Sequence, residues 1–344
     1  MITRILPALA LALGLAAAPL ATPALAQVGG PVVGTPTNPV APSLSADELE
    51  LQKALTGGRI AGRGTIPDAQ SNSLIQPAGR DWRAFHNVTL GWIGGIAVLG
   101  MLGIVVLFYA TKGRIPVEGG KAGRTIERFN AIERTAHWMT AGSFVVLALT
   151  GLNITFGRYL LLPVLGPEAF ATMSLWGKYA HNYLAFPFTL GVVLLFLMWV
   201  KDNIPNKLDI AWFKAGGGLI GHGHPTAARF NGGQKMVFWI TVLGGTAVAI
   251  SGYVLIFPFW ATDIAGQQLA HIVHGVISVL MIGAMIGHIY IGSAGMEGAF
   301  DAMGSGQVDL NWAKQHHGLW VEDEMKKARE TVAGPAGAKA QGAD

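Results

Sequence analysis

Two histidines on one apolar segment, His274 and His288, are spaced so that they can place two nitrogen ligands at different heights along a helix. Their separation of fourteen positions is nearly four helical turns, so both imidazoles face the same side. At about 1.5 Å per residue, their heights differ by roughly 21 Å. Such a helix can bind one metal centre near each end if other helices supply the second ligand of each centre.

The composition indicates that these histidines lie on membrane helices. Of the 344 residues, 51% are hydrophobic and only 13% are charged, whereas a soluble domain carries about 25% charged residues. Each long apolar segment has close to the roughly 20 residues that a helix needs to cross a bilayer, and a helix satisfies its own backbone in lipid. We expect an all-α integral membrane protein, a helical bundle of five transmembrane helices, at 88–110, 137–156, 179–200, 236–257 and 271–291.

The first 26 residues are expected to be a cleaved secretory signal peptide. Arg4 supplies the positive start, an apolar core too short to span a membrane follows, and Ala24-Leu25-Ala26 matches the small-residue cleavage pattern. An uncleaved membrane anchor is the alternative. Pro19 and Pro23 disfavour it because they interrupt the apolar run.

The rest of the chain divides into three further parts. Residues 27–85 are rich in Gly, Pro, Ser and Ala and are expected to form an extracytoplasmic arm, either a linker or a strap with a short helix around 45–55 capped by Ser45. Residues 86–322 are expected to form the transmembrane bundle. Residues 323–344 are rich in Ala, Gly and Lys, and we expect a disordered cytoplasmic tail there.

Positive charges are distributed unequally among the connecting segments, which predicts the orientation of the spans. Segments 111–135 and 201–235 contain six and five Lys or Arg residues, whereas 157–178 contains two and 257–270 contains none. The first two are therefore expected in the cytoplasm and the others outside. A cleaved signal also puts the mature N-terminus outside. We expect a multi-pass protein of the bacterial inner membrane with a periplasmic N-terminus and a cytoplasmic C-terminus.

This orientation assigns a depth to each histidine at or within an apolar segment. His137, at the start of the second span, and His288 lie near the cytoplasmic surface, whereas His181 and His274 lie near the outer surface. We predict that His137 pairs with His288 and that His181 pairs with His274, each pair binding one iron from two helices. Axial imidazoles are a common way to hold haem iron, so the four histidines predict two b-type haems stacked across the membrane.

The residues alone leave other interpretations of these histidines open. Histidines within spans can also pack, form hydrogen bonds or relay protons. Zinc or copper would require ligands that converge at one depth. The chain contains no cysteine, which excludes iron–sulfur ligation and covalently attached c-type haem.

The remaining histidines are expected to have supporting or solvent-exposed positions. His271 lies about 100° around the helix from His288, and His86 precedes the first span with no evident partner. Solvated loop positions are expected for His222, His224, His316 and His317. Glycines near the candidate ligands either give a flat porphyrin room or serve helix packing. These glycines are Gly142, Gly151, Gly275, Gly283 and Gly287.

Four segments resemble a known family. They are Arg128-Phe129-Asn130 through His137-Trp138, then Asn203-Ile204-Pro205-Asn206-Lys207, then Asn231-Gly232-Gly233-Gln234-Lys235-Met236, and His288-Ile289-Tyr290 followed by Trp312-Ala313-Lys314 and His316-His317. In this order, from about residue 124 to 322, they resemble the gamma subunit of respiratory formate dehydrogenase, a cytochrome b556 membrane anchor. The resemblance implies a four-helix diheme cytochrome b core, preceded here by one extra N-terminal span.

The resemblance also implies which residues hold the cofactors. The family's inner-haem ligands fall on His137 and His288, and its outer-haem ligands fall on His181 and His274. Its quinone site falls on Asn231, Gly233 and Gln234. A helix-start cap before Lys235 is the alternative interpretation of that last segment.

The resemblance also implies two haem b groups, quinone as the electron acceptor and two partner subunits. The partners are an iron–sulfur beta subunit and an alpha subunit that contains molybdenum or tungsten. We expect a membrane cytochrome b subunit of formate dehydrogenase that passes electrons from outside, through both haems, to quinone near the cytoplasmic side. No formate chemistry is expected in this chain. Alternatives are the same design serving a nickel–iron hydrogenase or a thiosulfate or polysulfide reductase, and a haem-free anchor or transporter.

Overall fold

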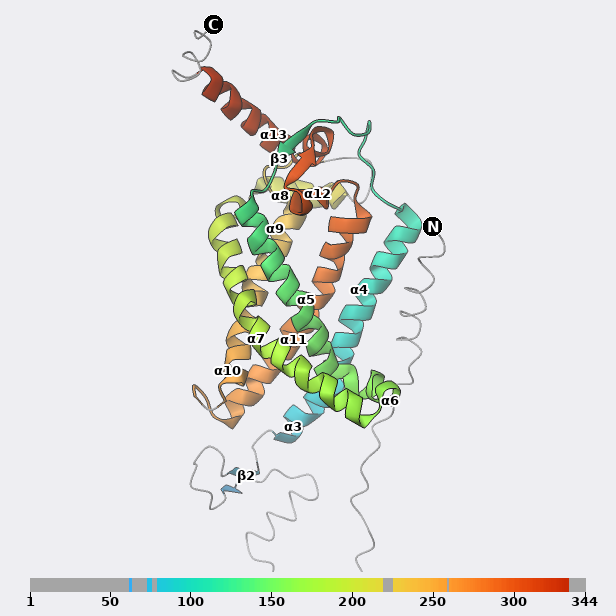
Figure 1. Cartoon of the computed structure of the whole chain (residues 1–344), viewed down its shortest axis with the longest axis vertical. Helices are drawn as coiled ribbons and strands as arrows, with labels where there is room; N and C mark the ends of the chain where they lie inside the picture. The colour runs from blue at the N-terminus through green and yellow to red at the C-terminus, as the bar shows by residue number, and fades with distance from the viewer. Residues whose placement is uncertain (1–61, 64–72, 76–78, 219–224, 259, 334–344) are drawn as a thin grey trace, which may run out of the picture.

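The computed structural model describes residues 62–63, 73–75, 79–218, 225–258 and 260–333, and its main feature is a bundle of long helices (Figure 1). Five of the described helices are long and apolar enough to cross a membrane, which confirms the expected number of spans. They are Asp81–Lys112, Ala131–Leu160, Pro167–Trp199, Gly232–Ile256 and Ile264–Gly295. The expected signal peptide at 1–26 and short helix at 45–55 lie outside the described residues.

Three of the five spans are assembled from consecutive helical segments. The first joins α3 (Gly79–Ala84), the π-helical η2 (Phe85–Thr89) and α4 (Leu90–Lys112). The fourth joins α9 (Gly232–Trp239), the π-helical η5 (Ile240–Gly244) and α10 (Gly245–Ile256), and the fifth joins α11 (Ile264–Tyr290) and the π-helical η6 (Ile291–Gly295). The first helix therefore begins within the segment 27–85 that we expected to be an arm.

The segment 157–178, expected to connect the second and third spans on the outer side, is largely helical. The helix α5 (Ala131–Leu160) continues into it, α6 (Leu162–Leu165) follows, and α7 (Pro167–Trp199) begins near its middle. Gly166 makes the turn with a φ of +76° that favours glycine. Pro167 starts α7, where its missing N–H would have no helical partner in any case. His181 consequently lies well inside a helix.

The first span packs along α11, and glycines of α11 allow the two helices to approach each other. Cβ atoms added at Gly275 and Gly283 would come within 2.7 Å and 2.9 Å of atoms of the first span. A Cβ at Gly287 would contact the same helix at 3.5 Å. Of the two roles open to these three glycines, the structure shows helix packing in lipid.

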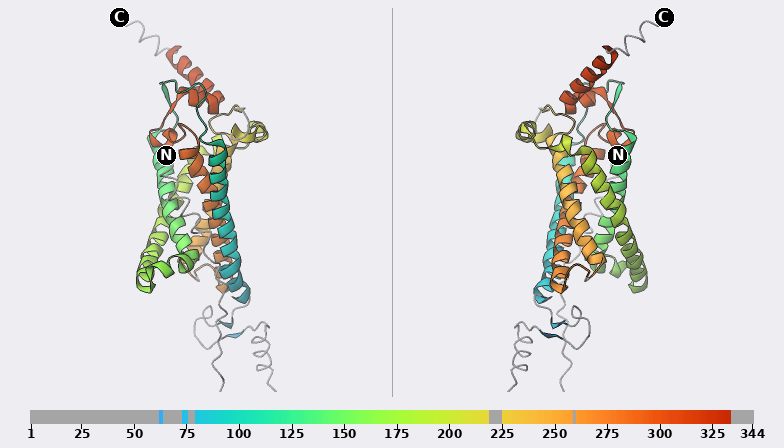
Figure 2. Two further views of the ribbon diagram at one scale, coloured as in Figure 1. Left: turned by 90° about the vertical axis from the view of Figure 1, so that its right-hand side faces the viewer. Right: turned by 90° about the vertical axis from the view of Figure 1, so that its left-hand side faces the viewer.

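A smaller layer covers one end of the bundle, called here the α13 end because α13 (Leu310–Ala333) lies there (Figures 1 and 2). The strands β3 (Thr125–Glu127) and β4 (Gln307–Asp309) pair antiparallel, with Ile126 opposite Val308. The other elements of this end are η3 (Lys201–Asn203), α8 (Lys207–Lys214), η4 (Gly216–Gly218) and α12 (Asp301–Gly304). Its buried core includes Phe129, Trp199, Phe230, Trp312 and Trp320. Earlier in the chain, β1 (Gly62–Arg63) pairs with β2 (Ser73–Ile75).

The C-terminal helix corrects one expectation about the tail. We expected disorder over 323–344, but α13 continues through Ala333, and residues 334–344 lie outside the described residues. Strong helix formers such as Glu, Met, Lys and Arg dominate its last turns. The ion pair between Lys327 and Glu324, with Nζ 2.7 Å from Oε1, adds a favourable contact at helical spacing.

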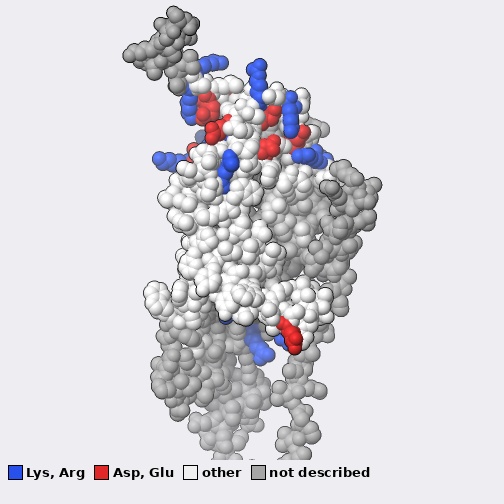
Figure 3. Space-filling view, viewed as in Figure 1, with Lys and Arg blue, Asp and Glu red and all other residues white. Residues whose placement is uncertain are grey.

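Charged side chains gather at the α13 end, whereas an uncharged belt covers the spans (Figure 3). The belt is consistent with a surface that faces lipid, where exposed apolar side chains such as Ile96, Leu107 and Leu149 have a favourable environment. The structure therefore supports the membrane-protein class that the composition predicts.

Candidate metal centres between the helices

The four candidate ligands lie in two pairs, each bridging α11 and one neighbouring helix. His137 of α5 faces His288 of α11, with ring centroids 6.3 Å apart and planes inclined by 62°. His181 of α7 faces His274 of α11, with centroids 6.1 Å apart and an inclination of 64°. These are the two pairings that the spacing and charge pattern predict, and the two sites have nearly the same geometry.

The separation within each pair suits one metal ion between two imidazoles. Rings that bind a metal from opposite sides, through metal–nitrogen bonds of about 2 Å, have centres about 6 Å apart. Among the described residues, no group of three or more His, Cys, Asp or Glu side chains could hold a metal ion. The described part of the protein thus offers two ligands per centre, as an iron already bound by the four nitrogens of a porphyrin requires.

Hydrogen bonds orient the imidazoles of the His181–His274 pair. His274 Nδ1 donates to the carbonyl oxygen of Val248 at 3.0 Å, and Ser251 Oγ lies 3.2 Å from the same nitrogen. His181 Nδ1 lies 2.8 Å from Thr150 Oγ1, whose own proton is directed to the carbonyl of Val146 at 2.7 Å. With Nδ1 as the donor, Nε2 of each ring keeps its lone pair for a metal.

The His137–His288 pair has a polar atom that the described side chains do not satisfy. His137 Nδ1 is buried and has no hydrogen-bond partner among the described residues. A buried polar atom without a partner is costly in a folded protein. A site that receives a cofactor or an ordered water molecule would remove that cost, so this observation is compatible with a ligand between the rings.

Glycines next to the His181–His274 pair keep the neighbouring backbones close to the rings. A Cβ added at Gly252 of α10 would lie 3.1 Å from His274 Cε1, and one at Gly151 of α5 would lie 3.5 Å from His181 Cε1. A Cβ at Gly142 would meet nothing within 4 Å, so open space lies beside α5 there. Gly151 and Gly252 therefore lie directly beside the paired rings, and Gly252 is a neighbour of the pair that the sequence interpretation missed.

The residues predicted to bind quinone begin α9 and cap it. Asn231 Oδ1 accepts a hydrogen bond from the Gln234 N–H at 2.9 Å, and Gln234 Oε1 accepts one from the Asn231 N–H at 3.2 Å. This reciprocal arrangement is a capping box. A Cβ at Gly233 would approach Trp212 to 2.7 Å. The helix-start cap, the alternative interpretation of this segment, is therefore present, and it leaves the amide nitrogen of Gln234 as a further donor.

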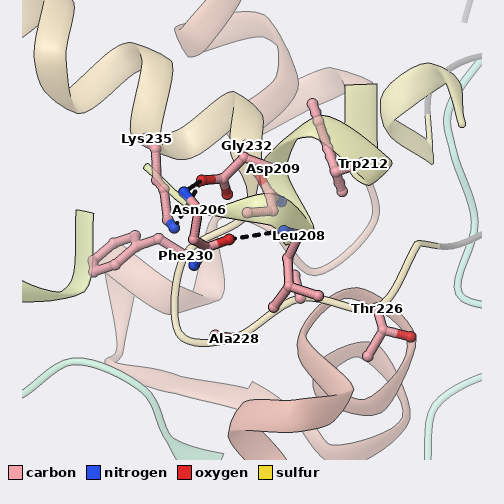
Figure 4. Close-up of a pocket in the computed structure, with 11 residues that line it drawn as sticks. Asn206, Leu208, Asp209, Trp212, Thr226, Ala228, Phe230, Gly232 and Lys235 are labelled. Carbon is pink, nitrogen blue, oxygen red and sulfur yellow. Dashed lines mark hydrogen bonds and ion pairs between the residues drawn. The ribbon is translucent and has the colours of Figure 1, made fainter. Parts of the chain in front are cut away.

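A shallow pocket lies beside this cap, between α8 and the segment that leads into α9 (Figure 4). Lys235 closes one side of it by donating to Asp209 Oδ2 and to the carbonyl of Ile204, both at 3.0 Å. Asn231, Gly232 and Trp212 also line the pocket. Polar cap residues and an aromatic ring thus meet at the α13 end of the bundle.

A buried polar cluster, called here the Glu133 cluster, ties the start of α5 to the α13 end. Glu133 Oε1 accepts from Trp199 Nε1 at 2.7 Å and from Arg229 Nη2 at 2.5 Å. Arg128 Nη2 donates to the carbonyl of Arg229 at 2.5 Å and to His317 Nε2 at 3.1 Å. These five side chains join segments far apart in the sequence, and sequence analysis gave no indication of the cluster.

His317 belongs to this cluster and is fully buried, which corrects its expected position as a solvated loop residue. Its Nδ1 donates to the carbonyl of Ala228 at 2.9 Å. Its neighbour His316 packs against Trp312, with ring centroids 5.2 Å apart. Burial of apolar residues from α13 against β3 and the loop after α8 explains the difference, because these partners are distant in the chain. His222 and His224 lie outside the described residues.

The pH dependence of stability should report on His317. Burial, followed by the adjacent Arg128 cation, lowers the pKa of His317 well below its ordinary value of 6.5. The folded protein therefore keeps this ring neutral, whereas the unfolded chain protonates it below about pH 6.5. Because the unfolded state then binds more protons, stability is lost as the pH falls, by up to about 1.4 kcal/mol per pH unit.

Thermal unfolding measured from pH 7.5 to pH 5 checks this prediction. We expect the melting temperature of the wild-type protein to fall more steeply with acidification than that of a His317→Gln variant. Glutamine can still donate to the Ala228 carbonyl and accept from Arg128, but it does not titrate. Equal pH dependence in the two proteins would contradict the prediction.

Five spans with paired imidazoles between them have the architecture of a membrane cytochrome b, an electron-transfer protein that carries haem b. Comparison with known families agrees with this class. The chain belongs to the prokaryotic cytochrome b561 family, whose sequence pattern matches residues 128–306. The first span precedes that match.

Curated relatives are similar over most of their own length. The chain is 28% identical over 210 residues to the cytochrome b556(Fdn) subunit of the nitrate-inducible formate dehydrogenase of Escherichia coli K12, covering 60% of this chain and 94% of the relative. It is 29% identical over 213 residues to the cytochrome b556(fdo) subunit of formate dehydrogenase from the same strain, covering 61% and 97%. A formate dehydrogenase cytochrome b556 subunit of Haemophilus influenzae is 26% identical over 209 residues, covering 58% and 84%. The family resemblance predicted from the four motifs is confirmed.

Proposed function

We propose that this chain is the membrane cytochrome b subunit of a formate dehydrogenase and that it binds two haem b groups. The observation that carries the proposal is the presence of two histidine pairs of matched geometry on one shared helix, α11. The names of the relatives support formate as the ultimate electron source. The chain itself would carry electrons and perform no formate chemistry.

The residues of this chain would hold and separate the two cofactors. His137 and His288 would bind the inner haem iron, and His181 and His274 the outer haem iron, through neutral imidazole nitrogens. When bound, each haem supplies an iron centre that accepts and releases one electron. Fourteen positions along α11 separate the two sites by roughly 21 Å along the helix axis, so the pairs would support electron transfer across the apolar belt.

The charge distribution supports an orientation with the α13 end in the cytoplasm. Lys and Arg are more numerous in the segments at this end than in those at the other end, and positive segments stay in the cytoplasm. The N-terminus would then be periplasmic, in a bacterial inner membrane. Electrons would arrive at the outer pair from an iron–sulfur beta subunit, which in turn receives them from an alpha subunit containing molybdenum or tungsten.

Quinone reduction is assigned to the start of α9, at Asn231, Gly233 and Gln234. This segment adjoins α8, whose Leu208, Ile210 and Phe213 are exposed. Such an amphipathic helix can lie in the membrane interface, where a lipid-soluble quinone would have access. Hydrogen-bond donors near the inner surface would bind a quinone oxygen close to the inner histidine pair.

Two substitutions of Gln234 separate quinone binding from helix capping. Gln234→Glu keeps the oxygen that the capping box uses but removes the amide donor, whereas Gln234→Leu removes both. We expect both variants to reduce quinone about five- to tenfold more slowly, the loss that one hydrogen bond of about 1 kcal/mol implies, with both haems retained. Activity measured with a soluble quinone analogue in the purified complex checks this. If Gln234→Glu reduced quinone at the wild-type rate, Gln234 would act only as a helix cap and would not bind quinone.

The first test of the proposed function is haem content. A dithionite-reduced minus oxidised spectrum of the purified chain, with haem quantified per polypeptide, should show two b-type haems. In the assembled complex, formate should reduce both of them. A well-folded chain that contains no haem would overturn the proposal, and haems that formate leaves oxidised would point to another electron donor.

A further inference from the structure

An aromatic cluster that the proposed electron path does not use lies where the first span meets α11. Trp82 stacks on His86, with ring centroids 5.3 Å apart and planes inclined by 30°. His271 completes the cluster, 5.7 Å from Trp82 and 6.1 Å from His86 between ring centroids. His86 lies in the π-helical segment η2, a local geometry that is frequent at functional sites.

The position of the cluster follows from the packing of two parallel helices. A Cβ at Gly275 would meet Leu90, one at Gly283 would meet Ala97, and one at Gly287 would meet Met101, so contacting residues are 185 or 186 positions apart. His86 and His271 are 185 positions apart and continue this register by one turn toward the α3 end. Because the family match begins at Arg128, the first span is an addition to the matched core.

The cluster lies one turn from the outer histidine ligand. His271 precedes His274 by three residues, which is about 4.5 Å along α11 and on a neighbouring face. A haem held by His274 and His181 would be wider than an imidazole ring, so residues one turn from His274 would be candidates to contact its edge. A b-type haem carries two carboxylate groups on one edge, and these need hydrogen-bond donors or cations.

The cluster is rich in nitrogen donors. Trp82 Nε1 is buried and has no hydrogen-bond partner among the described residues. His86 Nδ1 donates to Asn87 Oδ1 at 3.1 Å, so Nε2 of the same ring donates to a further anion only when the ring is the imidazolium cation. Two imidazoles and an indole N–H whose ring centroids lie within about 6 Å of one another suit an anionic oxygen ligand, since hydrogen bonds to a charged acceptor are stronger than neutral ones.

A metal ion fits this cluster less well than a carboxylate does. Protein metal sites of the zinc type usually have four ligands, and the described residues contain no group of three or more His, Cys, Asp or Glu side chains that could bind one. Trp82, the third member of the cluster, can only donate a hydrogen bond. The donor set therefore favours a carboxylate.

We propose that His86, His271 and the indole N–H of Trp82 bind the carboxylate groups on the edge of the outer haem. This proposal rests on the proposed function, because it requires a haem between His181 and His274. The extra N-terminal span would then contribute directly to the outer haem site. Hydrogen-bond donors near a carboxylate group of the haem neutralise part of its negative charge. This stabilises the reduced form of the haem iron relative to the oxidised form.

Potentiometric titration of the purified chain, monitored by haem absorbance, tests the proposal. We expect His86→Leu and His271→Leu to keep both haems and to lower the midpoint potential of the outer haem. At a fixed applied potential, the shift should change the ratio of oxidised to reduced outer haem at least threefold. A tenfold change in this ratio corresponds to 59 mV for one electron. The inner haem should keep its wild-type potential, and His271→Gln, which retains a donor, should restore part of the shift.

Lys178→Leu is the matched control. Lys178 is an exposed cation that precedes His181 by three residues, just as His271 precedes His274. The Lys178→Leu variant should leave the midpoint potentials of both haems unchanged. A shift in Lys178→Leu without one in the histidine variants would place the carboxylates against α7 and overturn the proposal. One equivalent of bound zinc or copper that is lost in His86→Leu would overturn it in favour of a metal site.

The outcomes also separate this proposal from the proposed function. A wild-type chain without haem would overturn both. A wild-type chain with two haems, together with unchanged outer-haem potentials in His86→Leu and His271→Leu, would overturn only the carboxylate assignment.

Discussion

Replacing His288 with alanine is expected to leave the protein with one haem, the outer one, and to abolish quinone reduction. His288 faces His137 across 6.3 Å between ring centroids, and no third His, Cys, Asp or Glu side chain forms a metal-binding group with them among the described residues. Loss of one axial ligand would therefore leave the inner haem held by a single protein bond. The outer pair is roughly 21 Å away along α11 and should bind haem normally, since distant sites act independently.

Haem content, spectrum and rescue together test this expectation. The ratio of haem to polypeptide should fall from two to one, and the remaining haem should still be reduced by formate in the complex. Alanine leaves a cavity of the size of an imidazole, so added imidazole should restore part of the second haem. Ile289→Ala, which alters an exposed neighbouring side chain, should bind both haems. Two haems in His288→Ala without added imidazole would show that the ligand assignment is wrong.

Hydropathy and spacing predicted the features that depend on local sequence. Apolar runs of the length of a bilayer determined the number of spans, and the fourteen-position spacing put His274 and His288 on one face of α11. The charge pattern then selected the partner of each histidine, because only residues at similar depth can meet. The two pairings agree with the structure for that reason.

Features that depend on contacts between distant segments were not predictable in this way. His317 is polar and a charged stretch begins at Glu322, so its sequence favours solvent, yet contacts with Ala228 and Arg128 bury it. The segment 157–178 is mostly helical because the connection between α5 and α7 needs only a few non-helical residues. Gly166 makes this connection with a positive φ. Cβ contacts at Gly275 and Gly283 show helix packing, a role that sequence alone could not distinguish from cofactor binding.

Replacing Glu133 with alanine is expected to cause the largest loss of stability among variants outside the histidine pairs. One carboxylate accepts hydrogen bonds from Trp199, Arg229 and the backbone N–H of Asn130, at 2.7, 2.5 and 3.0 Å. Glu133 is only 7% exposed. Removing one partner of a buried ion pair typically costs about 3–5 kcal/mol. The lower end applies here, because Arg229 is partly exposed and keeps Asp202 as a partner at 2.8 Å.

Thermal unfolding in detergent, followed by far-UV circular dichroism and by haem absorbance, measures this loss. About 3 kcal/mol corresponds to a decrease of roughly 4 °C in Tm, because the entropy of unfolding is about 2.1 cal/mol/K per residue and the chain has 344 residues. Glu133→Gln should fall between wild type and Glu133→Ala, since its single amide oxygen can accept from Asn130 N–H or from Trp199 Nε1 but its NH2 group replaces the other acceptor, and the charge is lost. Glu127→Ala, at an exposed position in β3, should leave the Tm unchanged.

The same variant should weaken the inner haem before the outer one. Glu133 lies one turn before His137 on α5, so the cluster fixes the helix segment that presents this ligand. Heating Glu133→Ala should therefore release the inner haem at a lower temperature than the outer haem, whose ligands His181 and His274 lie on other helices. Simultaneous release of both haems would mean that the cluster stabilises the bundle as a whole and does not act selectively on His137.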